Sequence, residues 1–161
     1  AKVVGKRSGI VLNNEMDDFV AQPGVPNAYG LVGSYANAVA PGAVPLSSMS
    51  PTLLESPDGK TRIAIGASGG PFIISSTLQV IVNLIDFEMD PNLAVSVPRM
   101  HHQWQPQKLF LDEGFPKDIH FLLQAKGHTI KEMEFYSSVQ VVVQKEGVFI
   151  GAQDPRKDEY R

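Results

Sequence analysis

The feature that most constrains the fold is a long segment, residues 14–49, in which neither a helical nor an alternating hydrophobic period persists. Glycine and proline interrupt it repeatedly, at Pro23, Gly24, Pro26, Gly30, Gly33, Pro41, Gly42 and Pro45. Connections of this length are uncommon inside compact domains, and they usually carry function or rest on another chain. We therefore expect this segment to serve a binding site or an interface.

Charge is distributed unevenly along the chain. No lysine or arginine occurs between Arg7 and Lys60. The same stretch holds the carboxylates of Glu15, Asp17, Asp18, Glu55 and Asp58. The net charge of the whole chain is −3, which excludes the basic stripe of a nucleic-acid binder and a polybasic membrane patch. Because cysteine is absent, disulfides, thiolate zinc sites and a cysteine nucleophile are excluded as well.

The remaining pattern predicts a mixed α and β fold. We expect strands at 9–12, 52–54, 62–65, 139–143 and 148–150, the first of them short and buried. Helices are predicted after Pro71, from Pro91 to before Pro98, and over 118–126. The first helix has an apolar face at Ile74, Thr77, Leu78, Ile81, Val82 and Ile85. The charged tail, residues 154–161, is expected on the surface.

Glu15, Asp17 and Asp18 place three carboxylates directly after the first predicted strand. With no cation nearby in sequence, they could receive a ligand ammonium group or a metal ion. A solvated turn or a helix N-terminus is the alternative interpretation. A metal is the weaker functional option, because no histidine or further carboxylate follows at ligand spacing.

Two further motifs could bind a substrate. Ser47 and Ser48 lie between prolines and could bind a carboxylate, although serine-rich turns are common. Gly69 and Gly70 lie between a predicted strand and helix, where their amides could stabilise the oxyanion of an acyl-transfer intermediate. The alternative is a tight turn that needs positive φ, and no Gly-Lys-Ser/Thr follows to make a phosphate loop.

Adjacent histidines, His101 and His102, suggest a metal site at first sight. Neighbouring side chains point to opposite faces of a strand and diverge by about 100° on a helix, so they chelate one ion poorly. We interpret both as structural, and we expect neither a metal nor a cofactor.

Several long motifs, taken together, resemble the small subunit of the γ-glutamyltransferase family, also called γ-glutamyltranspeptidase or glutathione hydrolase. They occur in the family's order at residues 9–19, 23–27, 45–52, 69–70, 98–104 and 151–156. The resemblance implies an N-terminal-nucleophile (Ntn) hydrolase of the α+β class, a four-layer αββα sandwich that is present here only in part.

In that family a precursor cleaves itself into a large and a small subunit. The new N-terminal threonine attacks a γ-glutamyl amide, and water or an acceptor amino acid or peptide resolves the γ-glutamyl-enzyme. The resemblance thus implies a heterodimer with its large subunit, a donor such as glutathione, and no nucleic-acid partner. Family members are commonly periplasmic, secreted or at the cell surface, although this chain itself leaves the compartment open.

By resemblance, Glu15 and Asp18 would hold the donor's α-ammonium, and Ser47 and Ser48 its α-carboxylate. The Gly69 and Gly70 amides would form the oxyanion hole. Two departures from the family pattern surround these glycines. Ala67-Ser68 before them is a tolerable change, whereas the effect of Pro71-Phe72 after them is open.

The sequence begins with Ala1, which has no hydroxyl, and all its threonines are internal. We therefore expect residues 1–161 to be a partial small-subunit domain that lacks the nucleophile segment and the large subunit, and to be inactive alone. One alternative is a non-catalytic remnant that binds a γ-glutamyl ligand or a partner subunit. Another is a related acylase or polyglutamate-degrading enzyme. Glu15 and Asp18 argue against a glutaryl donor, which has no ammonium for them to hold.

Overall fold

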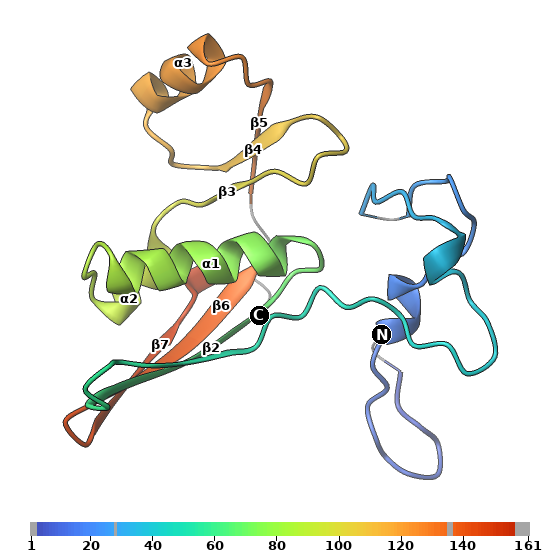
Figure 1. Ribbon diagram of the computed structural model, residues 1–161, viewed down its shortest axis with the longest axis horizontal. Coiled ribbons are helices and arrows are strands. Elements are labelled where there is room, and N and C mark those ends of the chain that lie inside the picture. The colour runs from blue at the N-terminus through green and yellow to red at the C-terminus, as the bar shows by residue number, and fades with distance from the viewer. Residues whose placement is uncertain (1–2, 28, 135–136, 157–161) are drawn as a thin grey trace. The chain divides into compact units, whose positions relative to one another are not determined.

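The computed structural model describes residues 3–27, 29–134 and 137–156, and the chain divides into two compact units, Ala1–Ser48 and Met49–Arg161 (Figure 1). The first unit contains two 3₁₀ helices, η1 (Glu15–Asp18) and η2 (Tyr35–Asn37). Single β-bridges join its remaining segments, for example Val20 to Ala38. Phe19 is the only described residue of this unit that is buried, so the unit is organised by hydrogen bonds more than by a core.

The short buried strand predicted at residues 9–12 is wrong. Val11 makes only an isolated bridge with Val4, and Ile10, Val11 and Leu12 are exposed. A strand needs a continuous neighbour to satisfy its backbone groups and to cover its apolar side chains. Among the described residues of this unit, no neighbouring strand supplies that cover.

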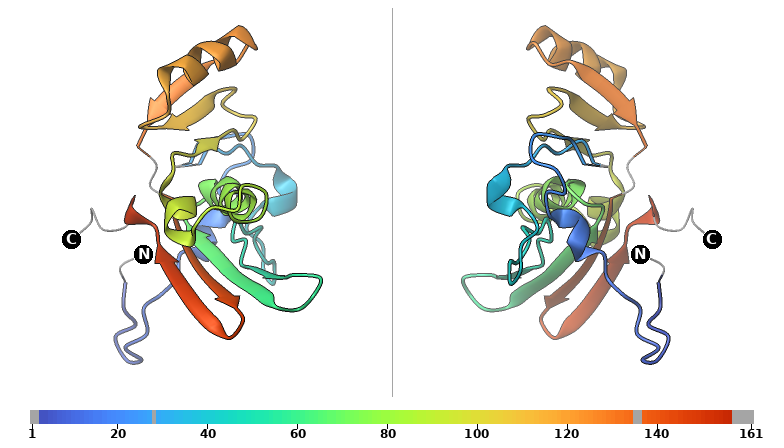
Figure 2. Two further views of the ribbon diagram at one scale, coloured as in Figure 1. Left: turned by 90° about the vertical axis from the view of Figure 1, so that its left-hand side faces the viewer. Right: turned by 90° about the vertical axis from the view of Figure 1, so that its right-hand side faces the viewer.

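The second unit is built on a four-stranded antiparallel sheet in the order β1-β2-β6-β7. Its strands are β1 (Thr52–Glu55), β2 (Thr61–Ser68), β6 (Ser138–Lys145) and β7 (Val148–Gln153). Helices α1 (Phe72–Ile85) and α2 (Pro91–Ser96) lie on one face of this sheet (Figures 1 and 2). Both hairpins and all three helices predicted from the sequence are confirmed, including Asp90, whose side chain caps α2.

The core lies between the helices and the sheet. Its buried members include Ile63, Ile65, Val80, Val95 and Val141. The strand members Ile63, Ile65 and Val141 alternate along β2 and β6 with outward-facing neighbours, as expected for a sheet covered on one face. Because β2 and α1 both pack in this core, the connection between them, residues 69–71, is held at both ends.

A smaller three-stranded sheet was not predicted. It consists of β3 (Met100–His101), β4 (Leu109–Asp112) and β5 (Ile130–Met133), with β4 and β5 parallel. Helix α3 (Lys117–Ala125) connects these two parallel strands. No described helix is long and apolar enough to cross a membrane.

The apolar face predicted for α1 is only partly correct, although the helix itself is confirmed. Thr77 is buried and Ile81 packs against the core, whereas Ile74, Leu78 and Ile85 are exposed. Ile73 and Val80, which were not in the predicted face, are buried. The helix is apolar on more than one side, so its period alone does not select the buried side. The buried side also includes two small hydroxyl residues, Ser76 and Thr77.

The tail prediction is wrong for two of the three described tail residues, Asp154 and Arg156, whereas Pro155 is exposed as predicted. Asp154 is fully buried and Arg156 is half-buried. Both belong to an ion-pair network described below. Residues 157–161 lie outside the described residues.

Candidate functional site

Two carboxylates share one side of η1. Glu15 and Asp18 are three residues apart, and side chains at this spacing are eclipsed in a 3₁₀ helix because it has three residues per turn. Both residues are half-buried, whereas Asp17 is exposed. The helix therefore separates a pair of carboxylates that can face one bound cation from a third that faces solvent.

The side chain of Asn37 ties this helix to the approach to the serine motif. Its amide nitrogen donates a hydrogen bond to the Asp18 carbonyl oxygen at 2.7 Å. Its amide oxygen accepts one from the Leu46 backbone N–H at 3.1 Å. Leu46 directly precedes Ser47, so a single side chain holds the end of the carboxylate helix beside the start of the serine motif.

Ser47 is exposed and Ser48 is half-buried, at the end of the first unit. Hydroxyl groups and backbone N–H groups in an exposed, proline-flanked segment can donate hydrogen bonds to an anion such as a carboxylate. The first unit thus brings three of the predicted elements together: Glu15, Asp18 and the segment entering Ser47. Asn37, which the sequence analysis did not select, makes the connection.

The second unit contains the predicted glycine pair, between β2 and α1. Gly69 and Gly70 have φ values of +134° and +56°, which confirms that a left-handed backbone is required at this turn. Their carbonyl oxygens accept hydrogen bonds from the backbone N–H groups of Phe72 (3.2 Å) and Ile73 (3.0 Å). Their own N–H groups have no hydrogen-bond partner among the described residues.

This turn packs tightly against the start of β6. A Cβ atom added at Gly69 would lie 2.7 Å from the Cα of Ser137, closer than real Cβ contacts come. Ser137 is itself fully buried. The glycine is therefore required both by its φ and by the close approach of another backbone. Backbone amides held on so rigid a support are suited to stabilise developing negative charge.

Behind Ser137 lies a buried ion pair. Arg99 and Asp154 are both fully buried, and Arg99 Nη2 lies 2.6 Å from Asp154 Oδ2. The same guanidinium donates to the Ser137 carbonyl at 2.8 Å and to the Val95 carbonyl at 2.9 Å. Burial lowers the pKa of Arg99, and the charge of Asp154 opposes that shift. The network therefore fixes the backbone against which Gly69 packs.

Arg156 extends the network to β4. It pairs with Asp154 at 3.0 Å and with Asp112, and it also donates to the Val95 and Val97 carbonyls. Burial lowers the pKa of Arg156, but hydrogen bonds to Asp112 and Asp154 outweigh it, so the pKa is raised overall. Two arginines and two aspartates thus compensate one another's charge inside the unit.

His101 has the structural role that the sequence analysis gave it. Its ring stacks on Phe72, with ring centroids 4.0 Å apart. Its Nδ1 lies 2.8 Å from Ser75 Oγ, and its Nε2 lies 2.8 Å from Gln103 Oε1. Burial lowers the pKa of His101, so the neutral ring joins β3 to the first turn of α1. His102 is exposed, and the two rings do not converge on a common site.

Among residues 3–27, 29–134 and 137–156, no group of three or more His, Asp or Glu side chains is arranged to hold a metal ion. The polar groups of the first unit suit an ammonium and a carboxylate. The Gly69 and Gly70 amides of the second unit suit an oxyanion.

The sequence model described as Gamma-glutamyltranspeptidase matches residues 1–161. The chain belongs to the γ-glutamyltranspeptidase family. The glutathione hydrolase proenzyme of Escherichia coli (strain K12) is 50% identical over 155 residues, which cover 96% of this chain and 27% of that protein. The chain therefore spans about a quarter of the length of this relative.

Solved structures agree with this assignment. An acivicin-inhibited γ-glutamyltranspeptidase is 42% identical, with a TM-score of 0.86 over 97% of this chain and 85% of that chain. The T380A mutant of the Helicobacter pylori γ-glutamyltranspeptidase is also 42% identical, with a TM-score of 0.84 over 94% of this chain and 83% of that chain. The α+β fold described above is thus that of γ-glutamyltranspeptidase structures, which belong to the Ntn hydrolases.

Proposed function

We propose that this chain forms the substrate-binding wall and the oxyanion hole of a γ-glutamyltransferase, or glutathione hydrolase. In this proposal residues 1–161 are part of a small subunit, and its partner is the large subunit of the same precursor. The observation that carries the proposal is the convergence, in a γ-glutamyltranspeptidase-family chain, of Glu15 and Asp18 with the segment entering Ser47. An α-amino acid group presents an ammonium and a carboxylate on one carbon, which matches this pair of subsites.

The chemistry follows from these positions. Glu15 and Asp18 bind the α-ammonium of the donor, and Ser47 and Ser48 bind its α-carboxylate. A threonine supplied by chain outside these 161 residues attacks the γ-carbonyl carbon through its hydroxyl oxygen and forms a γ-glutamyl ester. Its hydroxyl proton passes through the threonine's own α-amine to the leaving amine as the C–N bond of the amide breaks. The Gly69 and Gly70 amides bind the oxyanion, and each such donor contributes about 3–4 kcal/mol. Water, an amino acid or a peptide then takes the γ-glutamyl group.

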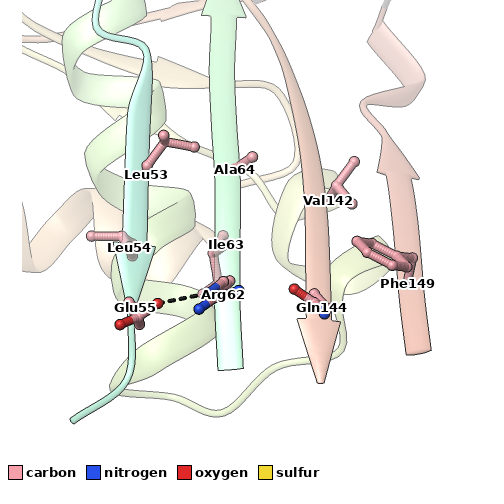
Figure 3. Close-up of a pocket in the computed structure, with 9 residues that line it drawn as sticks. All are labelled: Leu53, Leu54, Glu55, Arg62, Ile63, Ala64, Val142, Gln144 and Phe149. Atoms are coloured by element: carbon pink, nitrogen blue, oxygen red, sulfur yellow. Dashed lines mark hydrogen bonds and ion pairs between the residues drawn. The ribbon is translucent and has the colours of Figure 1, made fainter. Parts of the chain in front are cut away.

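The exposed face of the large sheet supports the proposed four-layer αββα architecture. Leu53 and Phe149 are exposed there, and with Val142 they border a hollow of about 410 Å³ across β1, β2, β6 and β7 (Figure 3). Large exposed apolar faces in soluble domains usually meet another apolar surface. In this proposal a second sheet, contributed largely by the large subunit, packs on this face.

The full-length protein provides the test. It should release p-nitroaniline from γ-glutamyl-p-nitroanilide, and its small subunit should gain the mass of one γ-glutamyl group when the reaction is stopped early. A protein that binds L-glutamate but neither turns over the anilide nor gains this mass would instead be a non-catalytic γ-glutamyl-binding protein. Preference for γ-linked polyglutamate over glutathione would move the assignment to a polyglutamate-degrading enzyme.

A further inference from the structure

Asn37 connects two segments that are otherwise far apart in the sequence. It is half-buried and ends η2, whose N-terminus is capped by Ser34. Its side chain spans 19 residues to reach the Asp18 carbonyl and 9 residues to reach the Leu46 N–H. Both groups of its amide are therefore used, one as donor and one as acceptor.

The backbone of Asn37 is held as firmly as its side chain. Its carbonyl oxygen accepts a hydrogen bond from the Val20 N–H at 2.8 Å, and its own N–H donates to the Ser34 carbonyl at 3.2 Å. The side-chain amide therefore projects from a fixed position. A planar amide held in this way sets the separation between the Asp18 and Leu46 backbones within narrow limits.

If the proposed function holds, the separation between the Asp18 and Leu46 backbones determines how a donor binds. The ammonium and the carboxylate of an α-amino acid share one carbon, so the groups that bind them must keep a fixed spacing. Asp18 carries one of these groups, and Leu46 is the residue before Ser47, which carries the other. We propose that Asn37 is a positioning residue that sets this spacing and thereby makes the site selective for donors with both α-groups. Asn37 itself contacts no substrate in this proposal, which rests on the proposed function.

A purely structural role would have a different signature. If Asn37 only stabilised the loop, its loss would weaken the binding of every ligand alike, or would lower stability without changing selectivity. If Asn37 sets the distance between the two subsites, its loss would weaken only ligands that engage both subsites at once. A ligand with a single α-group can adjust to whichever subsite it uses.

The test uses the full-length protein and its Asn37→Ala and Asn37→Asp variants. Asn37→Asp keeps the size and the acceptor but has no N–H to donate to the Asp18 carbonyl. Asn83→Ala is the matched control, because Asn83 likewise donates from a half-buried side chain to a backbone carbonyl, that of Ala94 at 3.2 Å, in the second unit. Inhibition constants are measured for L-glutamate, for glutarate (no ammonium) and for 4-aminobutyrate (no α-carboxylate), with γ-glutamyl-p-nitroanilide as substrate.

In both Asn37 variants, the inhibition constant of L-glutamate and the KM of the anilide should rise about 10-fold or more, whereas kcat changes less than KM. The constants for glutarate and 4-aminobutyrate should change less than about 3-fold, and Asn83→Ala should change none of them. Asn37 variants with wild-type selectivity, or with equal weakening of all three inhibitors, would overturn the inference while leaving the proposed function intact. A wild-type protein that neither cleaves the anilide nor binds L-glutamate would overturn both.

Discussion

Gly69 packs against Ser137 so closely that a Cβ on the glycine would lie 2.7 Å from the serine Cα. This contact joins the end of β2 to the residue before β6, and Arg99 holds the same serine through its carbonyl. The turn that carries the Gly69 and Gly70 amides is thus supported by a buried charge network. The oxyanion hole in our proposal depends on this support as much as on the glycines.

Gly69→Ala should therefore be severely disruptive. The variant would place a side chain at φ +134° and in collision with the Ser137 backbone. Strain and overpacking together should lower the free energy of unfolding by about 2–5 kcal/mol, and kcat should fall at least about 100-fold. Urea unfolding and steady-state kinetics of the full-length protein measure both effects.

Gly66→Ala is the matched control for that variant. A Cβ at Gly66 meets no atom within 4 Å, and Gly66 lies on β2, three residues before Gly69. Its unfolding free energy and its kcat should stay close to wild type. Equal effects of the two substitutions would contradict the role given to the Gly69–Ser137 contact.

Arg99→Met should destabilise the protein by about 3 kcal/mol or more, because it leaves the buried Asp154 carboxylate without its closest partner. The comparison variant is Arg62→Met. Arg62 pairs with Glu55 at the same distance, 2.6 Å, but both side chains are more than half exposed, so its loss should cost less than about 1 kcal/mol. Urea midpoints of the two variants should therefore differ clearly, and similar midpoints would show that burial of the pair is not decisive.

Acidification should weaken the structure through His101. Burial holds the pKa of His101 below its ordinary value, which is about 6.5 in an unfolded chain. Below pH 6.5 the unfolded chain therefore takes up a proton that the folded ring resists, so the free energy of unfolding falls as the pH falls. The contribution of the neutral His101 ring to the free energy of unfolding is fully present above pH 6.5. It is lost as the pH falls from 6.5 through the lower pKa of the folded state.

Thermal unfolding between pH 7.5 and pH 5 measures this effect. The unfolding temperature of the wild type should fall more steeply with pH than that of His101→Gln. The exposed neighbour His102 provides the control, since His102→Gln should keep the wild-type slope. A His101→Gln slope equal to that of the wild type would contradict the assignment.

The sequence predicted the two hairpins of the large sheet and its helices well because their signals are local, but it did not predict the pairing of β2 with β6 that joins the hairpins. Turn residues such as Pro57, Asp58 and Gly59 mark the first hairpin, and Asp90 with Pro91 marks the start of α2. The buried side of α1 could not be chosen in the same way. Apolar residues such as Ile73 and Ile74 lie on both sides of that helix, and only the position of the sheet decides which of them is buried.

The elements that sequence analysis missed depend on distant partners. β3 has two residues and exists because it pairs with β4. Asp154 resembles a surface aspartate in a charged tail until Arg99, 55 residues away, is placed beside it. No sequence pattern marks Asn37, because its two side-chain hydrogen bonds join segments that only the folded loop brings together.

The candidate site likewise has a part that local motifs predict and a part that only the folded structure shows. The motifs identified Glu15, Asp18, Ser47, Ser48, Gly69 and Gly70 as residues that could bind a ligand. The structure adds the half-buried state that Glu15 and Asp18 share, and the exposure that separates Asp17 from them. It also adds the left-handed conformation of both glycines.

The central claim is that the Glu15–Asp18 side of η1 receives the donor's α-ammonium, and one ratio tests it most directly. The quantity is kcat/KM for γ-glutamyl-p-nitroanilide divided by kcat/KM for glutaryl-p-nitroanilide, measured for the full-length wild type, Asp18→Ala and Asp17→Ala. We predict that Asp18→Ala lowers this ratio about 10- to 100-fold, because a hydrogen bond to a charged group contributes about 1.5–3 kcal/mol, and that Asp17→Ala leaves it unchanged. An unchanged ratio in Asp18→Ala, or an equal loss in both variants, would contradict the account.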